Sequence, residues 1–137
     1  MTRQQLIVDT KTPGACVGAV GTPYIVSYTP SSGGGWAKKG DNINGEEQSE
    51  QSGHSVSLSS DGNVVAIGAP YVQTGRVRVY AWNGTAWEKR GGDIGGEGQS
   101  DTNGWSISLS DDGSIVAIGA MHNDAHTYVN NNLGHVR

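Results

Sequence analysis

The feature that most constrains the fold of this chain is an internal repeat. The segment GHSVSLSSDGNVVAIGA at 53–69 returns 51 residues later as GWSISLSDDGSIVAIGA at 104–120. The same spacing relates Trp36 to Trp87, so the repeat extends beyond this near-identical core. A period of a few tens of residues is typical of proteins built from stacked structural units. We therefore expect an array of similar units.

Incomplete copies stand on either side of these two. CVGA at 16–19 resembles AIGA at 66–69, and GHVR at 134–137 resembles GRVR at 75–78, with eight additional residues inside the last copy. The predicted organisation is a degenerate first unit with its N-terminal lead-in and linker at 1–52, a second unit with its linker at 53–103, and an incomplete third unit at 104–137.

The core of each unit predicts a β-hairpin. Asp61-Gly62 and Asp112-Gly113 are dipeptides typical of the two-residue type I′ turn, in which both residues have positive φ. Pairing across such a turn sets large side chains on one face and small side chains on the other. The expected pairs are Leu58 with Val65, Val56 with Ile67, Ser57 with Ala66, Leu109 with Val116, Ile107 with Ile118, and Ser108 with Ala117.

Two further strands complete each unit. The segment at 76–82 alternates with period two, and Asn83-Gly84 predicts a turn before a fourth strand that carries Trp87. The Gly-rich run at 91–98 does not open a helix after a strand, so we expect a loop between units and not a phosphate-binding loop.

The distribution of large and small residues predicts how the units pack. A sheet with one bulky face and one shallow face can stack on its own copies, so that the bulky side of one fills the shallow side of the next. Radial stacking of this kind predicts an all-β fold. The expected architecture is a partial β-propeller of about three four-stranded antiparallel blades, the last one incomplete.

The units resemble the FG-GAP repeats of integrin-α-type β-propellers, in the variant that lacks a calcium loop. The resemblance covers about residues 14 to 137 and rests on the pattern GxSVxLSxDGxxVAIGAP followed by GxVxVY. The sequence departs from the family at Ser52-Gly53 and Asn103-Gly104, which replace Phe-Gly, and at Gly119-Ala120-Met121, where Met replaces Pro. The resemblance implies a non-enzymatic module for protein interaction, cell adhesion or scaffolding within a larger assembly or longer protein, in an extracellular or luminal setting.

Metal binding is not expected. The calcium loop of integrin-type repeats, Asp-x-Asp-x-Asp-Gly, supplies the several oxygen ligands that the ion needs. The segments at 59–63 and 110–114 lack that pattern and are short enough to be plain turns. The two histidines and one acid at His122, Asp124 and His126 are more often solvated than metal-bound in such an Asn-rich loop. The sequence therefore predicts no metal site and no cofactor.

Composition and charge exclude several functional classes. The formal net charge is −4 and no long Lys/Arg block is present, which argues against a nucleic acid partner. No apolar run approaches the roughly 20 residues of a membrane-spanning helix, and the first nine residues are too polar for a secretory signal. No paired acids or nucleophile–base set predicts an active site, so the chain is not expected to be an enzyme. The single Cys16 is expected to be a core position.

Candidate binding residues lie in the added segment of the last copy and at two tryptophans. The segment at 121–133 adds residues that the repeat does not require, and long loops on rigid scaffolds often carry function. Trp36 and Trp87 share a repeat position, which favours packing between units, whereas the other two tryptophans are less strictly repeated and leave open a carbohydrate-binding (lectin-like) propeller. The candidate residues for a protein partner or a glycan are Trp82, Trp105, His122, Asn123, Asp124, His126 and Tyr128.

The number of units predicts an incomplete structure. Propellers close with about four to eight blades, and this sequence encodes fewer than three complete units. An open face is expected at each end, together with an exposed strand edge at 134–137. A protein partner or self-association is therefore expected to complete the propeller. Three alternatives stay open: the chain is a fragment of a longer propeller, several chains assemble one propeller, or the chain sits against a large partner that covers the exposed strand edges.

Overall fold

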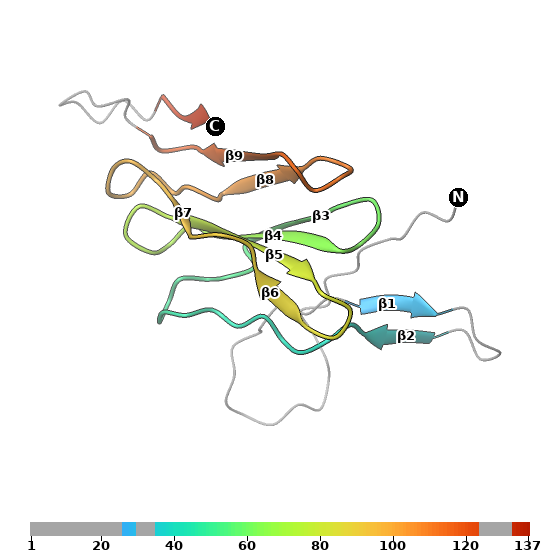
Figure 1. Ribbon diagram of the computed structural model, residues 1–137. Helices are drawn as coiled ribbons and strands as arrows, with labels where there is room; N and C mark the ends of the chain where they lie inside the picture. Colours follow the sequence, from blue (N-terminus) through green and yellow to red (C-terminus); the bar gives the residue numbers. More distant parts are fainter. Residues whose placement is uncertain (1–25, 30–34, 124–132) are drawn as a thin grey trace.

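The computed structural model of the chain describes residues 26–29, 35–123 and 133–137 (Figure 1). Every regular element in these residues is a β-strand, and the strands that pair do so in antiparallel fashion. The all-β expectation is confirmed for this part of the chain. Cys16 and most of the first copy lie outside the described residues.

The largest sheet is formed by the second copy of the repeat. Strands β3 (Ser55–Leu58), β4 (Val64–Ala69), β5 (Arg76–Trp82) and β6 (Trp87–Lys89) pair in chain order as a meander. The short strand β7 (Ile94–Gly95) pairs with the beginning of β5. The segment at 91–98 is therefore more than the expected loop, because β6 pairs only with the last three residues of β5 and leaves the earlier edge to β7.

The third copy forms a second sheet, and a separate hairpin precedes both. Strands β8 (Ser106–Leu109), β9 (Val116–Ala120) and β10 (His135–Val136) lie in the order β10-β9-β8. Strands β1 (Val26–Thr29) and β2 (Gly35–Lys38) pair with each other. The predicted register is confirmed in both copies, for all six residue pairs that the alternation predicted across β3–β4 and β8–β9.

The predicted turn type is wrong, although the register is right. Gly62 has a φ of 70° and Gly113 a φ of 68°, but Asp61 and Asp112 do not have the positive φ that a type I′ turn requires. The N–H of Gly62 instead donates to the carbonyl of Ser59 at 3.0 Å, which closes a turn one residue earlier. The physical reason is the aspartate side chain. It accepts hydrogen bonds from neighbouring residues and holds its own backbone at negative φ.

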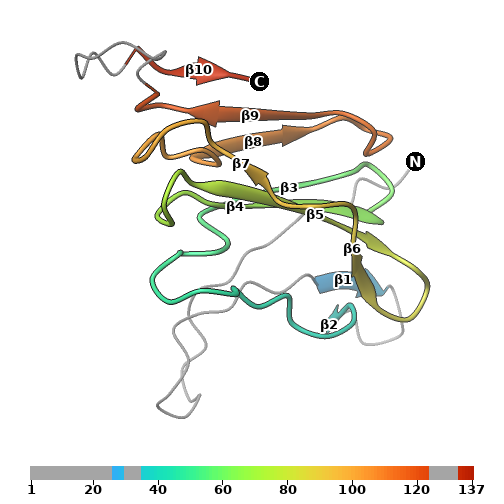
Figure 2. The same cartoon turned by 60° about the vertical axis from the view of Figure 1, so that its left-hand side comes forward.

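The two larger sheets lie face to face, with β3 and β4 against β8 (Figures 1 and 2). Between them Ala66 and Val77, from the small-residue face of the second copy, are fully buried with Ile118. Ile107 and Leu109 from the bulky face of the third copy pack against this cluster. The expected stacking of a bulky face on a shallow face is confirmed for these two sheets.

The bulky face of the second copy is covered by the segment that precedes β3. Ile43 from that segment is buried together with Val65, Ile67 and Tyr80. Trp87 packs against this cluster, and its Nε1–H donates to the carbonyl of Lys39 at 2.8 Å. The packing role expected for Trp87 is therefore present.

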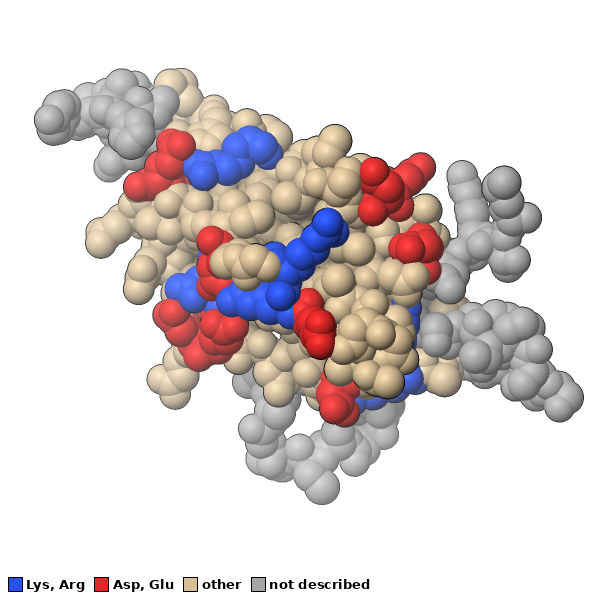
Figure 3. Space-filling model, viewed as in Figure 1, with Lys and Arg blue, Asp and Glu red and all other residues tan. Residues whose placement is uncertain are grey.

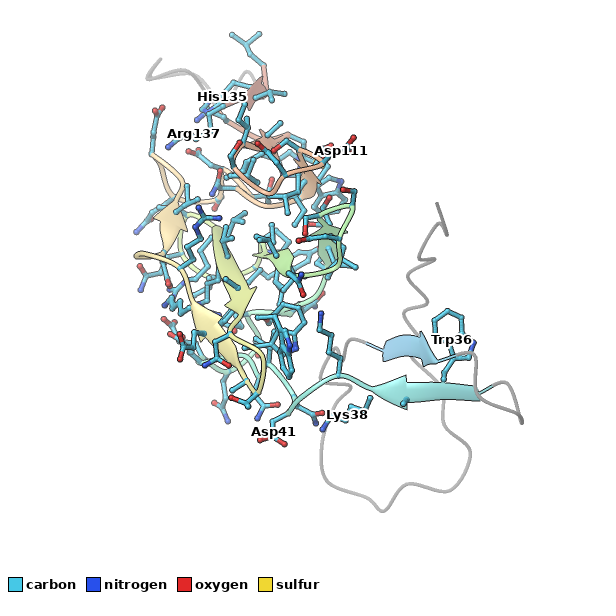
Figure 4. The ribbon with its side chains drawn as sticks, turned by 45° about the vertical axis from the view of Figure 1, so that its right-hand side comes forward. Trp36, Lys38, Asp41, Asp111, His135 and Arg137 are labelled. Atoms are coloured by element: carbon cyan, nitrogen blue, oxygen red, sulfur yellow. The ribbon has the colours of Figure 1, made fainter. Side chains whose placement is uncertain are left out.

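The other member of this repeat position has a different environment. Trp36 is 47% exposed and lies on the β1–β2 hairpin, which projects from the packed sheets (Figure 4). The shared repeat position of Trp36 and Trp87 therefore does not give them the same surroundings.

Candidate functional site

The outer face of the third sheet carries a shallow groove. The groove has a volume of about 360 Å³ and opens along β8, β9 and β10. Val136 is 73% exposed and Met121 is 43% exposed at this surface. The lining residues are Trp105, Ser106, Gly119, Ala120, Met121, Gly134, His135 and Val136.

An aromatic group lies where the second and third copies meet. The ring centroids of His54 and Trp105 are 4.5 Å apart, and those of Tyr71 and Trp105 are 6.0 Å apart. His54 and Tyr71 also contact each other edge-on, and Tyr71 is 48% exposed. Trp105 therefore belongs to a partly exposed aromatic surface next to the groove, which suits a candidate binding residue.

Trp82 lies in a different environment. Its ring is 5.3 Å from that of Trp87, and the ammonium of Lys39 lies 5.2 Å from the ring centroids of both tryptophans. The same ammonium donates to the carbonyl of Gly62 at 2.6 Å, so it is anchored to the neighbouring hairpin turn. These contacts hold Trp82 within the packing around Lys39 and give it a structural role.

Two candidates from the added segment, His122 and Asn123, lie in the described residues, and both contact the segment that precedes β8. Asn123 is 3% exposed, and its amide donates to the carboxylate of Asp101 at 2.9 Å. The backbone N–H of His122 donates to the carbonyl of Asp101, and its Nδ1 lies 3.5 Å from the hydroxyl oxygen of Thr102. The candidates Asp124, His126 and Tyr128 lie outside the described residues.

A buried ion pair was not foreseen from the sequence. Arg78 and Glu50 are both 2% exposed and make a bidentate contact, with N–O distances of 2.9 and 3.1 Å. Burial raises the pKa of Glu50, but the hydrogen bonds from Arg78 and from the backbone of Glu46 outweigh that effect, so the pKa lies below its usual value. Arg78 also contacts Asp93 at 3.2 Å.

The buried Arg78–Glu50 pair is surrounded by a network of more exposed ion pairs. Arg76 contacts Glu47 at 2.7 Å and Asp93 at 3.2 Å, and Lys89 also pairs with Asp93. Basic and acidic side chains alternate over one face of the molecule as a result (Figure 3). The charges largely neutralise one another, so this surface does not present a field of one sign to a ligand.

Part of this arrangement recurs in the third copy. Arg137 holds the repeat position of Arg78 and contacts Glu97 at 2.8 Å, as Arg78 contacts Glu46 at 3.3 Å. Arg137 and His135 belong to the outermost part of the structure, at β10 (Figure 4). The recurrence of these arginines and acids at equivalent repeat positions was a sequence signal of a shared role, but it does not specify which arginine pairs with which acid.

The aspartates of the hairpin turns make local hydrogen bonds. Asp112 accepts hydrogen bonds from the hydroxyl of Ser110 at 2.6 Å and from the backbone N–H of Ser114 at 3.0 Å. The hydroxyl of Ser110 is the largest cause that lowers the pKa of Asp112 to about 2, with Ser114 next. The corresponding Asp61 has its pKa lowered, first by the hydroxyl of Ser59. These carboxylates organise their turns.

Neither a metal site nor a membrane span is found in the part of the chain that the structure describes. No group of three or more His, Cys, Asp or Glu side chains in the described residues could hold a metal ion. Within the same ranges, no helix long and apolar enough to cross a lipid bilayer is present.

Comparison with known proteins gives no family assignment. No protein-family model matches the chain, and no curated protein matches it in sequence. The resemblance to FG-GAP repeats therefore rests on the motifs of the chain itself.

Proposed function

We propose that this chain is a segment of a β-propeller of the FG-GAP type, in which each repeat forms one blade. In this proposal it is a non-enzymatic module for protein interaction, adhesion or scaffolding within a larger assembly. The observation that carries the proposal is the stacking of two successive copies, bulky face on shallow face, with fully buried residues at the joint. A joint of this kind can be repeated by every further unit, and repetition is what a propeller requires.

Hydrogen bonds across the joint support the same proposal. The backbone N–H of Leu109 donates to the hydroxyl of Ser57 at 2.9 Å, so a serine on the shallow face binds the edge of the next sheet. At the turns, the N–H of Ser60 donates to the carbonyl of Asp111 at 2.9 Å, and the hydroxyl of Ser60 donates to the same oxygen. These contacts set the position of one sheet on the next toward the turn end of the hairpins.

The architecture is tested by extending the full chain. Arg137 holds the position of Arg78, so residues 79–103 and then whole units 53–103 can be appended in register. Radial stacking predicts that the array closes at one length of about four to eight blades. At that length the radius of gyration from small-angle scattering drops below its trend and the melting temperature rises sharply.

A second series of extended chains, with one substitution in each added unit, is the control for closure. Val77 is fully buried at the joint, so Val77→Asp in each added unit should prevent closure. A radius of gyration that grows by a constant step with every added unit, in the unmutated series, means that the repeats form a linear stack and the propeller proposal is wrong.

A second candidate function is carbohydrate binding, and the aromatic group of His54, Tyr71 and Trp105 favours it. Flat, partly exposed rings can stack on the apolar faces of sugars. For this function Trp105→Ala should abolish binding to a glycan array, and Trp82→Ala should preserve it because Trp82 is held by Lys39 and Trp87.

The two functions are separated by photo-crosslinking. A photoreactive residue at Tyr71, beside Trp105, is compared with one at Thr85 on the exposed β5–β6 turn. A protein adduct of one defined mass at Tyr71 alone supports the interaction module. Glycan binding that depends on Trp105, without such an adduct, supports the lectin.

A further inference from the structure

The groove on the third sheet has a counterpart on the second sheet, and that counterpart is filled. The repeat relates the groove residues Trp105, Ser106 and Gly119 to His54, Ser55 and Gly68, and relates Gly134 and Val136 to Gly75 and Val77. The strand register is also the same, because Val77 pairs with Gly68 and Val136 pairs with Gly119.

Exposure shows that one site is covered and the other is open. Val77 is fully buried, whereas Val136 is 73% exposed. Ala66 is also fully buried, whereas its counterpart Ala117 is exposed. Among the described residues the same surface is therefore present twice, once covered by a segment of the chain and once uncovered.

The occupant of the filled site is the chain's own segment that leads into β8. The hydroxyl of Ser55 donates to the carbonyl of Gly104 at 2.7 Å, and the N–H of Asn103 donates to the carbonyl of Thr74 at 3.1 Å. Asn103 also forms an isolated parallel bridge with Gly75. The segment therefore binds through its backbone groups at a tight turn, in which the N–H of Trp105 donates to the carbonyl of Thr102 at 3.0 Å, and Trp105 stacks on His54 beside it.

The close fit explains why glycine is present on both sides of the contact. A Cβ on Gly104 would lie 2.7 Å from the carbonyl oxygen of Arg76 and 3.0 Å from Cγ2 of Val77. A Cβ on Gly68 would overlap the carbonyl oxygen of Gly104. The centre of the groove therefore requires a glycine in the segment that enters, as at Gly104, and a glycine in the strand beneath it, as at Gly68.

We infer that the open groove on β8–β10 is a docking site for the Asn/Ser-Gly-aromatic-Ser segment of a further unit of this repeat. This inference deepens the proposed function, because it names the surface and the kind of partner that extend the assembly. In the docked state the hydroxyl of Ser106 donates to the carbonyl of the incoming glycine, which lies over Gly119. Val136 becomes buried as Val77 is.

The probe is the peptide SDTNGWSISLS, which corresponds to residues 100–110. It is added to the isotopically labelled full chain at up to about 1 mM and followed by NMR, a range that detects weak binding. The second-sheet groove holds its own covalently linked segment, so the peptide should shift the amide resonances of Ser106, Gly119 and Val136. The same peptide with Gly104→Val should cause no shifts.

Variants of the chain locate the binding. Val136→Asp places a charge in the groove and should weaken peptide binding by at least about tenfold. Ile115→Asp is the matched control, since Ile115 is 68% exposed on the β8–β9 turn, and it should leave binding unchanged. Ser106→Ala removes one donor and should weaken binding by about fivefold.

The outcomes separate this inference from the proposed function. No shifts with the unmodified peptide, or equal shifts with the Gly104→Val peptide, overturn the docking site even if the extended chains close as a propeller. Shifts at the groove caused by a glycan and not by the peptide identify a carbohydrate as the occupant and also overturn it. Peptide binding at the groove together with a linear extension series retains the docking site and rejects the propeller.

Discussion

At the scale of single residues, two repeat-related arginines show how burial changes the energetics of an ion pair, because the acid partner of one is buried and that of the other is exposed. Arg78 and Glu50 are both 2% exposed, whereas the side chains of Arg137 and Glu97 are 32% and 45% exposed. Removing one partner of a buried pair leaves an uncompensated charge, while an exposed pair contributes little because water screens it.

The prediction is that Arg78→Met and Arg137→Met differ strongly in stability. Arg78→Met should lower the free energy of unfolding by about 3–5 kcal/mol, because Glu50 is left buried and unpaired. Arg137→Met should cost at most about 1 kcal/mol. Urea unfolding of the full chain measures both, and Arg78→Met with Glu50→Leu should recover much of the loss. Equal costs for the two single variants would contradict this assignment.

At the scale of elements, the hairpin turns depend on a glycine that follows an aspartate. The structure differs from the expected type I′ turn because the aspartate side chain satisfies neighbouring N–H and hydroxyl groups, as in Asp112 with Ser110 and Ser114. Strand pairing remained predictable because the alternation of large and small residues sets which faces are buried, whatever the turn geometry.

The prediction at this scale concerns Gly113→Val and Gly62→Val. Both place a β-branched residue at positive φ, which should cost about 1–3 kcal/mol. At Gly113 a steric cost adds to the backbone strain, since its Cβ would lie 2.7 Å from the side chain of Val64. Gly91→Val combines positive φ with open space and isolates the backbone effect. Gly92→Val also has open space but no positive φ, so its stability should lie within about 0.5 kcal/mol of the parent. Thermal unfolding ranks the variants by stability. A loss of stability in Gly92→Val as large as in Gly113→Val would contradict the prediction.

At the scale of the whole molecule, the two larger sheets of the described chain form a short stack in which each packs against the other. The second sheet is covered on one face by Ile43 and on the other by the third sheet, whereas the outer face of the third sheet is bare around Val136. We expect assembly because the exposed face of the third sheet repeats a covered face of the second sheet. Burial of Val136 by a further unit would stabilise the assembly as burial of Val77 stabilises the chain itself.

The strands of the two hairpins, their register and the faces that stack were predictable from the sequence, because period-two alternation and a 51-residue repeat are visible along the chain, whereas the short strand β7 was not. The pairing of Arg78 with Glu50 became visible in the three-dimensional structure alone. The same holds for the difference between Trp105, which belongs to a partly exposed surface, and Trp82, which is packed against Lys39 and Trp87. The tertiary structure also decided which copy of the groove is filled. The reason is physical: burial and charge pairing depend on segments that are distant in sequence, and no local pattern specifies which of them come together.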